Sequence, residues 1–294
     1  MSAVTPDLAR RTFRGAEPIH GMIYFTPHGP DAYAEVGITH QRMTYFASRS
    51  AAMGPVPAEL VIATFFNFSP AIIRPAIPAA WDLATPAQVL AARLEAADRS
   101  LRQAWGADTD GPQVREAADL ARRAAERAAG QPQGRPLFAA HASLPWPDSP
   151  HLVLWHAQSL LREYRGDGHV ALLLTEGLDG LGALITHAAT GSIPAEALRT
   201  TRAWTEPEWA AGVDGLRAEG WLADGAGLAL SEAGQRRRQS IEDRTDVLSV
   251  YPYEALGADG CARLHQLTAG LSRAVMAADL GFPAALTARY SPAT

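Results

Sequence analysis

The sequence predicts a mainly α-helical protein made of two winged-helix-like halves, with a short two-stranded wing in the second half. Two capping boxes, Thr85-Pro-Ala-Gln88 and Thr205-Glu-Pro-Glu208, each follow a tryptophan and precede an amphipathic segment. In the second half, residues 222–231 form two short apolar segments around a Gly-rich turn. Because the two capped segments form a weak internal repeat, we predict halves at residues 1–147 and 148–294.

Composition favours an ordinary folded protein of the cytoplasm. The chain has 294 residues, of which 47% are hydrophobic and 19% charged, and all 26 of its basic residues are arginine. A net charge of -5 provides no global positive field for nucleic acid or an anionic membrane. The single cysteine, Cys261, excludes an internal disulfide, and no run approaches the roughly 18 apolar residues of a membrane span.

In the first half we expect a loose amino terminus and then a series of helices. Proline and glycine turns separate the helical segments, and Thr85 with Pro86 gives one of them a clear start. Alternating charges predict that the last helix of this half is solvated, with ion pairs Arg115/Asp119 and Asp119/Arg123. The expected helices are 31–50 with a break near Gly37, 58–66, one from Thr85 with an apolar stripe to Trp105, and 113–129, followed by a linker at 130–136.

In the second half, Gly166 and Gly168 are predicted to end a helix that covers residues 152–165. A second helix would then begin at 170–174, which places Asp167 and His169 at its amino-terminal end, where anions are favoured. After the Thr205 box and the wing, Ser231 caps a long helix to about residue 250, and a final helix covers about 254–278.

The best functional lead is the stretch Leu160-Leu-Arg-Glu-Tyr-Arg-Gly-Asp-Gly-His169. It places two arginines, two carboxylates, a tyrosine and a histidine between apolar segments, where polar groups cost free energy unless they pair. A ligand could supply that pairing. A structural ion-pair network between the halves explains the same residues equally well, and Asp167 also fits an ordinary helix N-cap.

If the stretch is a site, residues from both halves would meet in a cleft. His169 is the candidate acid or base, oriented by Asp167 or Glu163, because histidine titrates near neutral pH. For His20 and for the Phe65, Phe66 and Phe68 cluster, burial in the core is the simpler alternative. The candidate catalytic residues are His169 and Asp167, and the candidate ligand-binding residues are His20, Tyr24, Tyr45, Arg49, Phe65, Asn67, His156, Arg162, Tyr164 and Arg165.

We predict neither a metal nor another cofactor. The nine histidines show no ligand spacing, since His151 and His156 are five residues apart and no H-x-x-x-H motif occurs.

The segment from Thr205 through Leu230-Ser-Glu-Ala-Gly234 resembles the winged-helix domain of MarR-type regulators. Most of the chain resembles a family of largely uncharacterised actinobacterial winged-helix proteins. The residues that carry this resemblance are Tyr45-Phe-Ala-Ser-Arg49, Gly54-Pro-Val, Ala63-Thr-Phe-Phe-Asn-Phe68, Leu161 to His169 and Gly177-Leu-Asp-Gly180. MarR relatives bind phenolic or other aromatic molecules between helices and release DNA, so the resemblance implies an aromatic ligand.

The sequence departs from MarR proteins where DNA would be read. Residues 205–220 contain four carboxylates, Glu206, Glu208, Asp214 and Glu219, against the single cation Arg217. The wing has no basic residue, so this surface should repel a duplex. We therefore expect binding of a small apolar or aromatic molecule between the halves, with or without metal-free acid–base chemistry. The alternative is a MarR-type DNA-binding regulator, dimerising through its terminal helices.

Overall fold

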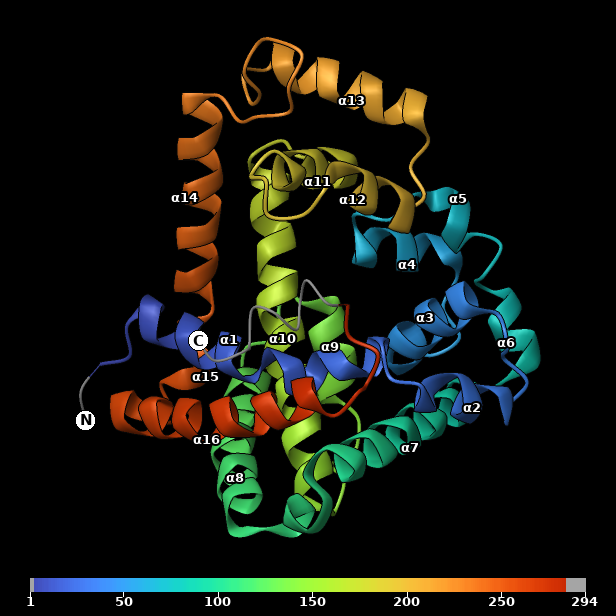
Figure 1. The fold of residues 1–294 in the computed structure, drawn as a ribbon, viewed down its shortest axis with the longest axis vertical. Coiled ribbons are helices and arrows are strands. Elements are labelled where there is room, and N and C mark those ends of the chain that lie inside the picture. Colours follow the sequence, from blue (N-terminus) through green and yellow to red (C-terminus); the bar gives the residue numbers. More distant parts are fainter. Residues whose placement is uncertain (1–2, 284–294) are drawn as a thin grey trace.

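The computed structural model describes residues 3–283, which are almost entirely helical (Figure 1). The helices of the first half are α1 (Pro6–Gly21), α2 (His28–Ala34), α3 (Gln41–Ser50), α4 (Ala58–Phe65), α5 (Pro70–Ile73), α6 (Ala79–Leu83), α7 (Pro86–Trp105), α8 (Pro112–Ala129) and α9 (Pro136–Ala142). Those of the second half are α10 (Pro150–Thr175), α11 (Gly180–Ala188), α12 (Ala195–Thr201), α13 (Glu206–Ala218), α14 (Glu232–Leu248), α15 (Val250–Tyr253) and α16 (Gly257–Ala277). Short 3-10 turns are η1 (Met22–Tyr24), η2 (Ala51–Met53) and η3 (Gly106–Asp110).

The central element is α10, which packs against α1, α8, α9 and α14. The predicted break at Gly166 and Gly168 is wrong, because α10 continues through both glycines for 26 residues. Gly168 serves a packing role: a Cβ there would lie 2.5 Å from Nη1 of Arg135, whose guanidinium stacks 3.7 Å from the Tyr164 ring centroid. A glycine inside a helix costs about 1 kcal/mol, and this close approach explains why it is present.

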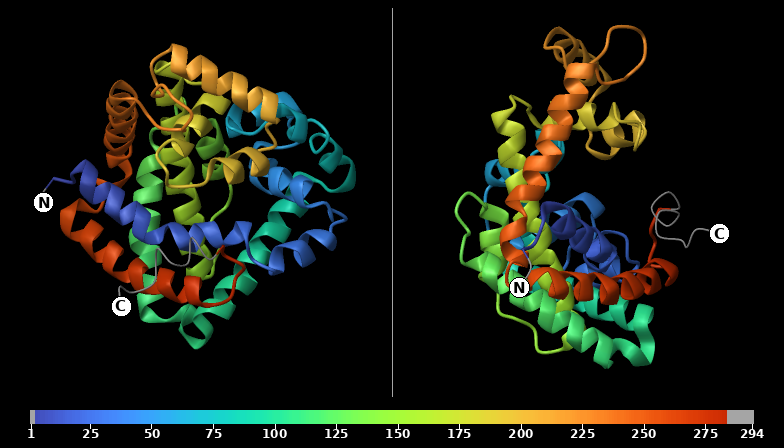
Figure 2. Two further views of the ribbon diagram at one scale, coloured as in Figure 1. Left: turned by 45° about the horizontal axis from the view of Figure 1, so that its top comes forward. Right: turned by 90° about the vertical axis from the view of Figure 1, so that its left-hand side faces the viewer.

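The first and last helices of the described chain lie together. Helix α1 packs along α16, and Figure 2 shows the two side by side. The amino terminus, expected to be loose, is a helix from its sixth residue because Thr5 accepts a hydrogen bond from the Leu8 N–H and Pro6 follows at the first helical position. The largest core cluster joins residues of both predicted halves, among them Phe46 and Leu101 from the first and Leu154 and Leu264 from the second.

Helix α8 is confirmed as a helix, but only one of its faces is solvated. Its alanines, including Ala117, Ala121 and Ala124, are buried, and α8 packs closely on α10. The two predicted ion pairs do not form; Arg115 instead donates to the Asp110 carbonyl oxygen at 2.9 Å.

No single helix of the described residues is long and apolar enough to cross a membrane. Helices α10 and α11 meet that test only as a pair, with a bend of 97° between them.

A second, smaller core holds together what we call the winged unit, residues 178–241, at the top of Figure 1. Leu178, Ile185, Trp221 and Ile241 are its most deeply buried side chains. The capping box at Thr205 and the cap at Ser231 start α13 and α14 as predicted. The prediction of a two-stranded wing is wrong: within the described residues this segment has one isolated antiparallel bridge, between Leu222 and Leu230, and no strand.

The winged unit is fixed to the first half through the loop at residues 66–69. The Trp204 Nε1–H donates to the Asn67 carbonyl oxygen at 3.0 Å, and the Ser69 N–H donates to the Arg202 carbonyl oxygen at 3.0 Å. The α11 amino terminus touches the same loop, since a Cβ on Gly180 would lie 1.9 Å from the Phe66 carbonyl oxygen.

Candidate functional site

Five residues of the predicted site line two cavities, and these cavities share Arg162 and Glu17. The five are Tyr24, Tyr45, Arg162, Arg165 and His169. We call one the aromatic pocket; it measures about 730 Å³ and lies between η1, α2, α3 and the turn after α12. We call the other the cationic cleft; it measures about 1200 Å³ and lies between α1, α10 and α16. Arg162 donates to Glu17 at 3.2 Å, so this ion pair stands between the two cavities.

The walls of the aromatic pocket contain a cluster of rings. Tyr45 lies 5.6 Å from Tyr24 and 5.4 Å from Phe68, and Phe46 lies 5.2 Å from Phe68, as ring centroids. Such separations are typical of favourable aromatic pairs. Of the predicted ligand-binding residues, Tyr24, Tyr45 and Arg162 line this pocket.

Arg202, which the sequence did not single out, lies at the edge of the same pocket. Its guanidinium is 5.0 Å from the Phe68 ring centroid, and its Nη1 donates to the Thr201 hydroxyl at 2.9 Å. The Nε atom is buried without a hydrogen-bond partner, and among residues 3–283 no carboxylate lies within ion-pair distance of Arg202. Burial lowers the pKa of Arg202, and the nearby cations Arg49 and Arg162 lower it further.

Behind the pocket lies a buried ion-pair network. Arg49 contacts Glu163 at 3.1 Å and donates to the Tyr45 hydroxyl at 3.0 Å, while Arg162 contacts Glu163 at 3.3 Å. Burial alone would raise the pKa of Glu163, but the two adjacent guanidinium groups outweigh it and lower the pKa to about 2. Arg49 therefore holds Tyr45 in place and does not line either cavity, and Phe65 packs beneath it at 4.5 Å.

His20 is buried in the core, which was the simpler of its two predicted roles, and both of its hydrogen-bond partners are hydroxyl groups. Its Nδ1 shares a hydrogen bond with Ser159 at 2.8 Å and its Nε2 shares one with Tyr24 at 2.9 Å. Burial holds the pKa of His20 well below its ordinary value, so the ring is neutral and orients Tyr24.

Three further predicted ligand-binding residues line neither cavity. His156 is buried against Trp146, at 4.9 Å between ring centroids, and Tyr164 packs against Phe138 at 5.1 Å. Asn67 contributes its backbone carbonyl to the Trp204 contact described above.

The predicted pairing of Asp167 with His169 is wrong. Two residues apart on one continuous helix, their side chains lie on different faces. Asp167 accepts a hydrogen bond from the Phe138 N–H at 2.9 Å, so it caps α9 from a neighbouring helix, and burial raises its pKa to about 6. His169 shares a hydrogen bond with the Thr245 hydroxyl at 2.9 Å, and burial lowers its pKa to about 4.

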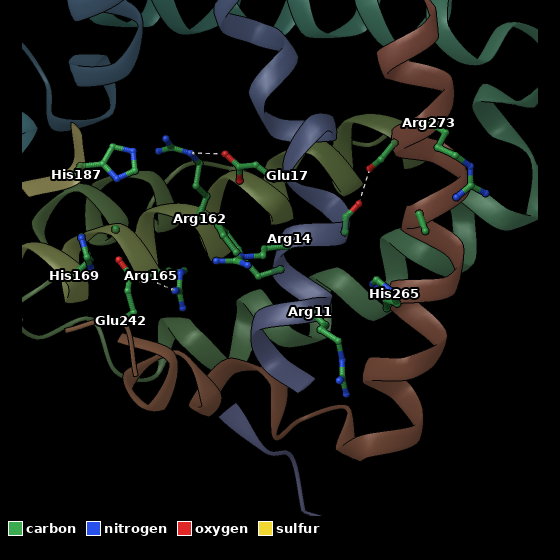
Figure 3. Close-up of a pocket in the computed structure, with 15 residues that line it drawn as sticks. Arg11, Arg14, Glu17, Arg162, Arg165, His169, His187, Glu242, His265 and Arg273 are labelled. Carbon is green, nitrogen blue, oxygen red and sulfur yellow. Dashed lines mark hydrogen bonds and ion pairs between the residues drawn. The ribbon is translucent and has the colours of Figure 1, made fainter. Parts of the chain in front are cut away.

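His169, Arg162 and Arg165 line the cationic cleft, shown in Figure 3. Arg165 contacts Asp246 at 2.8 Å and lies 5.4 Å from the Phe13 ring centroid. The sequence did not single out the other charged or titratable residues of the lining, because α1, α11, α14 and α16 bring them together from distant positions. These residues are Arg11, Arg14, Glu17, His187, Glu242, His265 and Arg273.

No group of three or more His, Cys, Asp or Glu side chains within residues 3–283 is placed to hold a metal ion. Arginine lines both cavities, together with tyrosine in the aromatic pocket and histidine in the cationic cleft.

Comparison with known proteins gives one match. A family model described as a helix-turn-helix family matches residues 9–282, nearly the whole chain. No curated protein and no solved structure gives a significant match.

Proposed function

The chain belongs to this helix-turn-helix family, and from that premise we propose that it binds a small aromatic acid in the aromatic pocket. The observation that carries the proposal is Arg202, a half-buried cation without a carboxylate partner at the edge of a ring-lined pocket. Removing a cation from water costs several kcal/mol unless an anion compensates it. A ligand carboxylate or phenolate on Arg202, with its ring among Tyr24, Tyr45 and Phe68, supplies that compensation.

The same arginine offers a route from the ligand to the helix-turn-helix. We assign that motif to helices α12 and α13, and Arg202 lies in the turn between them. Its backbone N–H donates to Leu198 in α12, and its carbonyl oxygen accepts from Ser69 in the first half. A ligand that draws the guanidinium into the pocket therefore acts on the turn that positions α13.

Binding without turnover is the form of the proposal that the geometry supports. A general acid or base works best with a pKa near the operating pH. His169 lies in the other cavity with a pKa of about 4, and Asp167 caps α9.

The test compares 4-hydroxybenzoate with its neutral amide, 4-hydroxybenzamide, by isothermal titration calorimetry. We expect the acid to bind at least about tenfold more tightly than the amide. A hydrogen bond to a charged group stabilises a complex more than a neutral hydrogen bond, by about the free energy of a tenfold change in affinity. Arg202→Gln should remove the difference, whereas Arg74→Gln, at an exposed helix end outside the pocket, should preserve it. Equal affinities for acid and amide in the unaltered protein, or no binding of either, would contradict the proposal.

A second candidate function is DNA binding, and the family match is the observation that favours it. The α13 surface opposes it, because the only cation of α13, Arg217, donates to the carbonyl oxygens of Gly225 and Gly227 at 2.9 and 3.3 Å. A DNA-binding role would therefore depend on cations elsewhere in the molecule.

A further inference from the structure

The cationic cleft concentrates positive charge in an acidic protein. Five arginines line it against two carboxylates, Glu17 and Glu242, although the whole chain has a net charge of -5. Asp7, Glu163 and Asp246 pair with three of these arginines from outside the lining. A cavity in which one sign of charge is in excess focuses the field and raises the local concentration of oppositely charged ligands.

The arginines come from three helices that face the same space. Arg11 and Arg14 lie on α1, Arg162 and Arg165 on α10, and Arg273 on α16. Figure 3 shows Arg14 extending from α1 into the region of Arg165, with Arg11 and Arg273 farther along the cleft.

Carboxylates hold the inner arginines in position. Arg165 contacts Asp246 at 2.8 Å, and Arg162 contacts Glu17 at 3.2 Å, so the side chains are ordered before any ligand arrives. Arg162 also contacts Glu163 at 3.3 Å, and Arg165 also donates to the Ser249 hydroxyl at 3.3 Å. A guanidinium has five N–H donors, so these contacts still leave some of them for a ligand. Arg14 and Arg273 are exposed at the rim and reach an incoming anion from the opposite side.

The histidines add hydrogen-bonding capacity without adding negative charge. His169 is neutral at physiological pH and is oriented by the Thr245 hydroxyl at 2.9 Å. His265, also in the lining, has a buried Nδ1 without a hydrogen-bond partner among the described residues. The Thr245 hydroxyl itself donates to the Ile241 carbonyl oxygen, so the one N–H of neutral His169 is used on Thr245. The neutral imidazole of His265 can donate to an anion, as a carboxylate in its place could not.

We propose that the cationic cleft is a second binding site, for a small molecule that carries several anionic groups, such as phosphates or carboxylates. The volume of about 1200 Å³ exceeds the usual size of a drug-sized ligand pocket, and the arginines are distributed along the cleft rather than around one point. A single phosphate would leave most of these cations unused. This site shares the Arg162–Glu17 ion pair with the aromatic pocket, but the proposal does not depend on the ligand proposed there.

The probe is inorganic tripolyphosphate, titrated into the full-length protein at about 0.15 M salt, where distant surface charges are screened. We expect saturable one-to-one binding, and the double variant Arg14→Gln/Arg273→Gln should weaken it at least about tenfold. The control variant Arg74→Gln/Arg236→Gln removes the same charge from exposed positions outside the cleft and should keep the affinity. Circular dichroism melting checks that all variants fold.

Four outcomes would overturn the inference. The first is absence of saturable binding of both tripolyphosphate and citrate, and the second is equal weakening in the cleft and control variants. The third is displacement of tripolyphosphate by random duplex DNA at equal phosphate concentration. The fourth is loss of binding in Arg202→Gln, which would place the anion in the aromatic pocket. A parallel titration with citrate identifies the anionic group: binding of either probe at the cleft arginines supports the multiply charged class.

Discussion

At the scale of single residues, burial keeps three histidines neutral. Burial is the largest cause of the lowered pKa of His141, His156 and His169, and it brings each to about 4. The unfolded chain therefore binds more protons than the native protein between about pH 4 and 6.5. Their stabilising contribution is complete above pH 6.5 and is lost as pH falls towards 4. Asp167 acts in the opposite direction, because its raised pKa favours the native state as pH falls through about 6.

We predict that His169→Gln makes the pH dependence of stability shallower. One such histidine accounts for on the order of 2 kcal/mol at pH 4.5, since one pKa unit corresponds to about 1.4 kcal/mol. The free energy of unfolding, measured by urea denaturation at pH 7 and pH 4.5, should fall less in the variant than in the unaltered protein. His40→Gln, at an exposed position, is the control. Parallel pH profiles for all three proteins would show that His169 does not titrate in this way.

Part of the candidate site could be predicted from single residue types. Tyr24, Tyr45 and Arg162 were predicted as ligand-binding residues because aromatic and arginine residues near an apolar segment suggest a cleft. All three line the aromatic pocket. Arg202 could not be found in this way, since its burial results from contact with Phe68, more than a hundred residues earlier. Asp167 was misplaced for the same reason: its partner Phe138 lies in another helix.

At the scale of elements, the contact between α11 and the loop at residues 66–69 leaves no room for a side chain. A Cβ on Gly180 would lie 1.9 Å from the Phe66 carbonyl oxygen, which belongs to the backbone and cannot easily move. By contrast, a Cβ on Gly215, within α13, would meet nothing within 4 Å. The two glycines thus occupy opposite environments in neighbouring helices.

We predict opposite effects of the same substitution at these glycines. Gly180→Ala should destabilise the protein by about 2 kcal/mol or more, as overpacking does when backbone must shift. Gly215→Ala should stabilise it by up to about 1 kcal/mol, because alanine is the better helix former. Thermal melting of both variants beside the unaltered protein measures the difference. A stabilising Gly180→Ala would mean that α11 does not dock against this loop.

Local signals predicted elements well, and long-range contacts explain the failures. The capping boxes at Thr85 and Thr205 gave the starts of α7 and α13 because the pairing groups lie within four residues of each other. The glycine at position 168, inside α10, is explained by its contact with Arg135, the residue before α9. The sequence of α10 alone cannot predict that contact.

At the scale of the whole molecule, the charges on α13 and on the cationic cleft are opposite. The exposed side of α13 is acidic, whereas the cleft arginines lie on α1, α10 and α16. The only cation of α13, Arg217, donates to the backbone of the loop that follows α13. An α13 docked in a major groove would thus bring carboxylates towards the phosphates.

We predict that the unaltered protein gives no sequence-specific shift of a duplex from its own promoter region at about 0.15 M salt. Electrophoretic mobility measured with and without 4-hydroxybenzoate, against an excess of random duplex, is the test. A shifted band that survives this competition would establish the DNA-binding alternative, and its salt dependence would count the phosphates contacted.

Helical periodicity in the sequence predicted the mainly helical architecture, but it did not predict which helices pack against each other. The pairing of α1 with α16 joins segments more than two hundred residues apart. The division into halves at residues 147/148 stays a prediction. It was suggested by the similarity of the two capped helix starts at Thr85 and Thr205.

Because α10 is one continuous helix, it connects two distant regions of the molecule directly. Its 26 residues extend about 39 Å, from the region where α8 and α9 hold it to the point where α11 begins. If α10 tilted by a few degrees about the end that packs on α8 and α9, its other end and the turn before α11 would move by ångströms. Arg162, on this helix, lines both cavities, so a ligand in either one would contact the same helix.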